Sequence, residues 1–89
     1  MTNAVTIPAS VIYKKVGDEA VLLQIERGIY YGLDAVGTRI WELLAEGKSQ
    51  EEARDAIVEE YDVDADTADR DIAALIGELL LHGLVERTP

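Results

Sequence analysis

The apolar residues of this chain change their spacing once, near residue 34. Before that point they gather in three short segments rich in β-branched and aromatic residues, which are typical of strands. After it they recur every three or four residues, which is typical of helices. A chain of 89 residues has room for little more than one core. The pattern therefore predicts one domain, residues 1–89, ordered over about 11–86.

Three strands are expected at 11–16, 20–25 and 29–33. The turns between them, at 17–18 and 27–28, are tight, so the simplest pairing is an antiparallel meander with the first and third strands as edges. Val21, Leu23 and Ile25 share one face of the second strand, because side chains alternate along a strand. On the third strand, Ile29, Tyr31 and Leu33 share a face and Tyr30 points the other way.

Three helices are expected at about 36–45, 49–61 and 64–82. Ser49 and Glu52 form a capping box at the start of the second helix. Gly83 suits the residue that ends the third helix, where Leu84 can pack back on Leu79. The order βββααα, whose last two helices resemble a helix-turn-helix pair, predicts an α+β, winged-helix-like domain. The first ten residues are weakly patterned, and we expect them to be loosely ordered.

The third expected helix has more apolar surface than one stripe requires. Its first stripe is sufficient for a core, and a second stripe lies beside it, interrupted by Asp69. Two interpretations stay open: a wider core that includes packing against the first helix, or the wall of a groove with a carboxylate at its rim. The first stripe comprises Ala68, Ile72, Leu75 and Leu79, and the second Ala73, Ile76 and Leu80.

The third strand offers a second wall for such a groove. An edge strand has free N–H and C=O groups, to which an extended peptide can pair while its side chains enter the groove. The alternative is an edge protected by its short length. We expect Asp69 to pair with a basic peptide residue or to accept a hydrogen bond, and Ile76→Asp to keep the fold but lose binding. The candidate peptide-binding residues are Ile29, Tyr30, Tyr31, Gly32, Leu33, Asp69, Ile72, Ala73, Ile76 and Leu80.

The net charge of −10 is unevenly distributed. Residues 45–89 hold four Lys and Arg against thirteen Asp and Glu. Such a surface disfavours nucleic acid and anionic membranes and favours basic partners, although solubility alone also explains it. No apolar run approaches a membrane span, the N-terminus lacks a signal-peptide pattern, and there is no cysteine. We therefore expect a cytoplasmic protein.

Catalytic and metal-binding patterns are missing. His82 is the only histidine, and without cysteine it offers no zinc site. No nucleotide-binding glycine motif occurs, and the carboxylates are typical of solvated helix faces. The sequence therefore predicts a binding module that is not an enzyme and uses no cofactor or metal.

Residues 31–47 resemble the PqqD pattern. They contain its Tyr-x-Leu strand end, then Gly-x-x-Ile-Trp-x-Leu-Leu, then a turn ending in Gly. The capped second helix and the ending Leu-Leu-Leu-His-Gly-Leu-Val continue the match, which covers about 11–86. Asp34 replaces the usual Asn, and both residues can cap a helix.

The resemblance implies a recognition element for ribosomally made, modified peptides. In such domains the leader segment of a precursor adds as a strand between the third strand and the third helix. Stand-alone proteins of this size are similar to the PQQ-pathway peptide chaperone or to the recognition proteins of lasso-peptide clusters. Residues 28–37 and the acidic third helix are more similar to the lasso type. That type works beside a separate cysteine leader peptidase and an ATP-dependent cyclase.

Three other classes compete with this interpretation. DNA binding fits the helix-turn-helix outline, but Arg70 is the only Lys or Arg of the third helix. A phosphopantetheine carrier needs a serine after an acid, and Ser49 follows Lys48. A dimer would cover the second apolar stripe with another copy. Trp41 is interpreted as a buried anchor, with peptide contact as the alternative.

Overall fold

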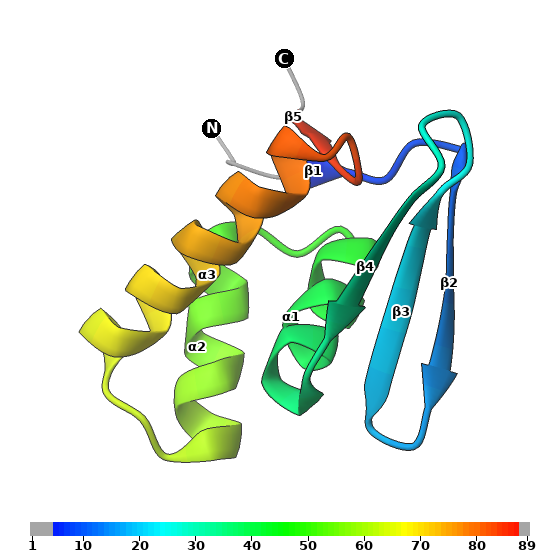
Figure 1. Ribbon diagram of the computed structural model, residues 1–89. Coiled ribbons are helices and arrows are strands. Elements are labelled where there is room, and N and C mark those ends of the chain that lie inside the picture. Colours follow the sequence, from blue (N-terminus) through cyan, green and yellow to red (C-terminus); the bar gives the residue numbers. More distant parts are fainter. Residues whose placement is uncertain (1–4, 88–89) are drawn as a thin grey trace.

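The computed structural model describes residues 5–87, and a three-stranded antiparallel sheet forms one of its layers. The strands are β2 (Val11–Val16), β3 (Glu19–Gln24) and β4 (Ile29–Leu33), in the order β2-β3-β4. Gly28 takes the positive φ of 66° that the tight turn before β4 requires. The predicted meander and its two edges, β2 and β4, are confirmed (Figure 1).

The inner face of the sheet is set by β3, which starts one residue earlier than expected. Ala20, Leu22 and Gln24 are buried, whereas Val21 and Leu23 share the outer face. Gln24 is tolerated inside because its amide nitrogen donates to the Gly83 carbonyl at 2.8 Å. Its side-chain oxygen accepts from the Glu26 backbone N–H at 2.9 Å. A buried polar side chain with its hydrogen bonds made costs little.

The three helices are α1 (Ala35–Ala45), α2 (Gln50–Tyr61) and α3 (Ala65–Leu81). Each begins after a capping side chain, and the capping box at Ser49 and Glu52 is present. The end of α3 is also as expected, since the Leu84 N–H donates to the Leu79 carbonyl at 2.8 Å. The predicted order βββααα in an α+β fold is therefore confirmed.

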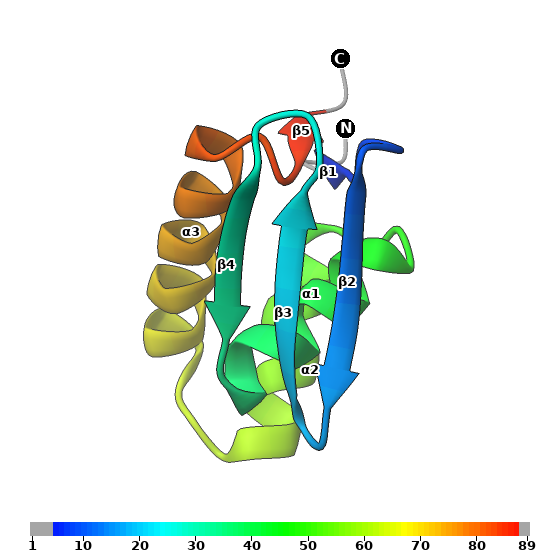
Figure 2. The same cartoon turned by 45° about the vertical axis from the view of Figure 1, so that its right-hand side comes forward.

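The helices form a layer in which only α1 lies directly against the sheet. Figure 1 shows α2 next to α1, and Figure 2 shows α1 behind the strands and α3 beside β4. An ion pair of 2.9 Å from Lys15 to Glu42 links β2 to α1. Another, of 2.8 Å from Arg39 to Glu60, links α1 to α2. Because α3 packs closely on α2, its position depends on the other helices rather than on β4.

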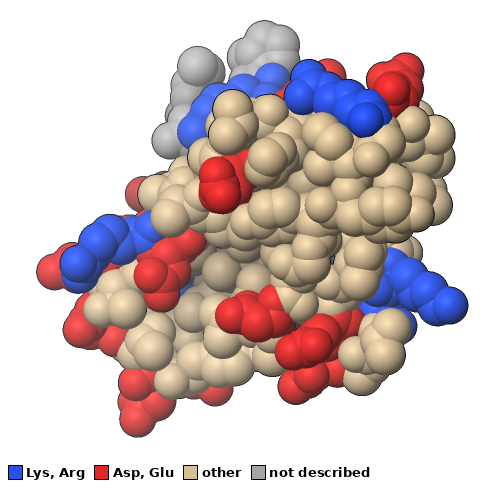
Figure 3. Space-filling model, viewed as in Figure 1, with Lys and Arg blue, Asp and Glu red and all other residues tan. Residues whose placement is uncertain are grey.

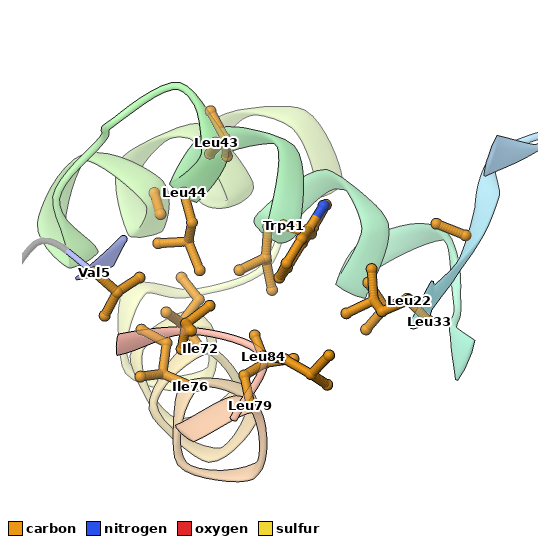
Figure 4. Packing of buried hydrophobic residues seen from close by; sticks show 14 of the residues in the cluster. Val5, Leu22, Leu33, Trp41, Leu43, Leu44, Ile72, Ile76, Leu79 and Leu84 are labelled. Atoms are coloured by element: carbon orange, nitrogen blue, oxygen red, sulfur yellow. The ribbon is translucent and has the colours of Figure 1, made fainter. Parts of the chain in front are cut away.

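The core lies where α1, α3 and the inner face of the sheet converge. Trp41 is fully buried, and its ring meets the Tyr13 ring edge-on with 5.7 Å between centroids. The interpretation of Trp41 as a buried anchor is confirmed. Figure 4 shows the side chains of Ile72 and Ile76 entering this core from α3, near Leu44.

The two ends of the described chain pair with each other. Val5–Thr6 (β1) and Glu86–Arg87 (β5) form a separate antiparallel pair. Val5 is only 3% exposed, so the expectation of loose order is wrong for this segment. Its strand partner lies about 80 residues away in sequence, so no local pattern indicated it. Residues 1–4, to which the expectation also applied, lie outside the described residues.

Within residues 5–87, none of the three helices is both long enough and apolar enough to span a bilayer.

Candidate functional site

A groove of about 440 Å³ separates β4 from α3, and we call it the slot. Strand β4 supplies one wall, α3 the other, and the first turns of α1 the floor. The slot is lined by Tyr31, Gly32, Leu33, Asp34, Val36, Gly37, Ile40, Asp71, Ala74 and Leu75.

The wall formed by β4 is an unpaired strand edge. Strand β4 pairs with β3 on one side, and among residues 5–87 no strand pairs with its other side. Helix α3 runs beside this free edge without packing closely against it (Figure 2). Alternate residues of an edge strand direct their N–H and C=O groups outward, so these groups are available in the slot.

The wall formed by α3 consists of Asp71, Ala74 and Leu75, whose spacing places them on one helix face. Higher on the same face, the His82 ring approaches the Tyr31 ring of β4, with 5.6 Å between centroids. Burial, together with the nearby Glu78 carboxylate, raises the pKa of the Tyr31 phenol. The Tyr31 phenol is therefore uncharged at neutral pH, and the residue lines the slot.

The floor is built by the start of α1. Asp34 caps this helix, and its Oδ1 accepts a hydrogen bond of 2.8 Å from the Gly37 N–H. A β-carbon on Gly37 would lie 3.1 Å from the same oxygen and 3.3 Å from Leu33. Glycine at this position therefore lets the cap, the end of β4 and the floor pack together.

The predicted β4 residues divide between the two faces of the sheet. Tyr31, Gly32 and Leu33 line the slot, as expected. Ile29 is half-buried on the inner face, beyond the slot. Tyr30 is 72% exposed and points to the outer face, as the strand pattern predicted.

The predicted α3 residues do not line the slot. Ile72 and Ile76 are 0% and 1% exposed, so the wider-core interpretation is correct for both, and Ile76→Asp is not expected to keep the fold. Asp69 lies 3.5 Å from Arg54 of α2. Ala73 is exposed outside the slot, and Leu80 is half-buried against the core. The prediction assumed that α3 covers the sheet. In the structure α3 packs mainly on α2, so the helix face that points toward β4 is the one next to the predicted face.

Several residues of the slot were missed by the sequence analysis. Asp71, Ala74 and Leu75 form an i, i+3, i+4 set that was present in the sequence but looked like an edge of the core stripe. The contribution of the α1 start was hidden because Val36 and Ile40 have the spacing of core residues. The remaining missed residues are Asp34 and Gly37.

The charge around the slot is negative. Asp34 and Asp71 both line it, and neither forms an ion pair within residues 5–87. Figure 3 shows acidic side chains interrupting the uncharged surface between α3 and β4, with Lys and Arg at the margins of the view. The slot therefore suits a neutral or cationic guest.

In the part of the chain that the structure describes, no three His, Asp or Glu side chains lie close enough together to hold a metal ion. What the slot offers is an extended row of backbone groups beside apolar side chains. This arrangement is suited to binding an extended chain.

Comparison with known proteins assigns the class. The family model described as "Coenzyme PQQ synthesis protein D (PqqD)" matches residues 19–85. The chain belongs to this family, as the pattern at residues 31–47 indicated. No curated protein matched the chain significantly.

Two solved structures share the whole fold. The chain in "TbiB1 in Complex with the TbiA(beta) Leader Peptide" is 47% identical, with a TM-score of 0.87 over 91% of this chain and 94% of that one. The chain in "Lasso peptide synthetase B1 complexed with the leader peptide" is 27% identical, with a TM-score of 0.84 over 96% of this chain and 98% of that one. Each alignment covers more than nine-tenths of both chains.

Proposed function

We propose that this chain binds the leader segment of a ribosomally made precursor peptide as an added strand between β4 and α3. The observation that carries the proposal is the free edge of β4, which faces α3 across an open groove. An added strand pairs its backbone with β4 and places alternate side chains over Leu33, Ile40 and Leu75. Two similar proteins were solved with leader peptides bound, which supports this assignment.

The biosynthetic setting that we propose is that of lasso peptides. The family alone includes PQQ synthesis, but one of the two similar structures is described as a lasso peptide synthetase component. In this setting the chain is a non-enzymatic cytoplasmic adaptor. It delivers the leader to a separate cysteine leader peptidase and presents the precursor to an ATP-dependent cyclase. Neither a cofactor nor nucleic acid takes part.

A blocking substitution tests the slot. Ala74 lines the slot and is exposed, so Ala74→Trp places an indole in the groove without disturbing the core. We expect the wild-type chain to bind fluorescently labelled TbiA(beta) leader peptide and Ala74→Trp to lose at least tenfold in affinity, measured by fluorescence anisotropy.

The matched control is the adjacent residue. Ala73 is also exposed on α3 but does not line the slot, so Ala73→Trp should bind the leader as the wild-type chain does. Equal losses in the two variants would place the peptide elsewhere. Absence of binding by the folded wild-type chain, both to this leader and to the leader of the second complex, would refute leader recognition.

A further inference from the structure

The slot contains carboxylates for which the described part of the protein provides no cation. Asp34 and Asp71 line it, and Glu78 lies about two turns along α3 from Asp71, close enough to affect Tyr31. None of the three forms an ion pair within residues 5–87. Asp69, on another face of α3, has Arg54 at 3.5 Å. The slot and the α3 face beside it thus carry acids that no Lys or Arg of the described residues pairs with.

These carboxylates occupy the two ends of an apolar surface. Asp71 and Asp34 lie where β4 ends, and Glu78 lies near Tyr31, toward the end where the His82 ring meets it. Leu75 lies between Asp71 and Glu78 along α3, and Leu33, Val36 and Ile40 add apolar surface to the slot. A guest strand therefore passes from an acidic end over an apolar centre to a second acidic end.

The spacing of the acids matches a short interval on an extended peptide. Asp71 and Glu78 are seven residues apart on a helix that rises about 1.5 Å per residue, so their α-carbons are about 10 Å apart along the axis. An extended strand covers that distance in about three residues. Because side chains alternate between the faces of a strand, two residues that both reach α3 must be an even number of positions apart. Lys and Arg side chains are long enough to accommodate the difference between three and four residues.

We propose that the slot selects a guest segment in which two Lys or Arg residues, four positions apart on one face of the strand, flank an apolar residue midway between them. This inference rests on the proposed function and names the specificity of the same site. Asp71 and Glu78 are the specificity-determining residues, with Asp34 adding charge at the Asp71 end. Each exposed charge pair contributes a modest factor, about two- to fivefold in affinity. The charges therefore choose among guests, whereas the strand pairing and the apolar centre supply most of the binding.

Selection from a random peptide library tests the proposal without assuming any particular guest sequence. A displayed library of random ten-residue peptides is selected on the immobilised full chain, with the Ala74→Trp variant used to remove peptides that bind elsewhere. We expect the recovered peptides to be enriched in Lys or Arg at two positions four apart, with an apolar residue midway between them. Selection on Asp71→Lys should replace one of these basic positions by Asp or Glu.

The affinities of single recovered peptides provide the controls. Asp71→Asn should weaken binding about two- to fivefold at low salt, and the loss should shrink as salt screens the charges. Asp69→Asn, on the same helix but outside the slot, should change nothing. Apolar peptides without basic enrichment would overturn the charge selection and leave slot binding intact. If no recovered peptide binds the wild-type chain without also binding Ala74→Trp, the proposed function itself is contradicted.

Discussion

Leu75 and Ile76 are adjacent on α3, but their side chains have different surroundings. Leu75 is half-buried at the wall of the slot, whereas Ile76 is 1% exposed in the core. One residue of a helix corresponds to a rotation of about 100°, so an error of one position moves a residue from the site to the core. The composition of α3 does not fix this rotation. It depends on packing against α2, which hydrophobic spacing within α3 does not encode.

At the residue scale we expect Ile76→Asp to unfold the domain. A carboxylate at this fully buried position would have no counter-charge, and burying an isolated charge costs more than a small domain can offset. Circular dichroism and thermal melting should show loss of the cooperative transition at neutral pH. Ala73→Asp, on the exposed face of α3, is the control and should melt within a few degrees of the wild-type chain. A folded Ile76→Asp variant would contradict the packing described for α3.

At the scale of elements, short local signals mark the boundaries well. The capping box at Ser49, the Asp34 cap and the turn at Gly83 were recognisable because each involves residues within five positions of one another. The position of α3 beside β4 was not recognisable from such signals, because it results from contacts between distant helices. The strand wall of the slot was therefore predictable from the sequence. For the helix wall, the sequence predicted that α3 provides it but not which residues of α3 face the slot.

The cap of α2 should contribute measurably to stability. The Ser49 hydroxyl accepts a hydrogen bond of 3.1 Å from the Glu52 N–H, and Ser49 is buried. We expect Ser49→Ala to lower the free energy of unfolding by about 1 kcal/mol, within the usual range for such caps. Urea denaturation measures this change. Ser49→Asp should recover most of the loss, since aspartate also caps, and an unchanged midpoint in Ser49→Ala would show that the cap is not stabilising.

The same cap should make stability depend on pH in the acid range. A hydrogen bond from the Ser49 backbone N–H lowers the pKa of the Glu52 carboxyl in the folded state. A lowered folded pKa stabilises the protein above the ordinary carboxyl pKa, about 4, and the stabilisation is lost as pH falls through the lowered value. The melting temperatures of the wild-type chain and Glu52→Gln should therefore differ most at neutral pH and converge below about pH 4. A constant difference from pH 7 to pH 3 would exclude this contribution.

At the scale of the whole molecule, the slot depends on how two layers are joined. The sheet is held to α1 by the Trp41 core and the Lys15–Glu42 ion pair, and α3 reaches the sheet chiefly through α1 and α2. The β1–β5 pair connects the N-terminal segment to the end of α3, and β1 also packs on α1. This pair therefore braces the end of α3 next to His82, whose ring lies 5.6 Å from the ring of Tyr31 in the slot wall.

We expect Val5→Ala to weaken this brace and to affect both stability and the slot. Val5 is 3% exposed, and removing two buried methyl groups should lower the free energy of unfolding by about 1.5–3 kcal/mol. Because β5 follows α3 closely, hydrogen exchange of the last turn of α3 should accelerate more than that of β3, which is held by strands on both sides. Thr6→Ala is the matched control, since Thr6 is the exposed residue of the same strand. Uniform acceleration across the domain would mean that the β1–β5 pair contributes only to global stability. Selective acceleration at the end of α3 would show that this strand pair holds the helix wall of the slot in place.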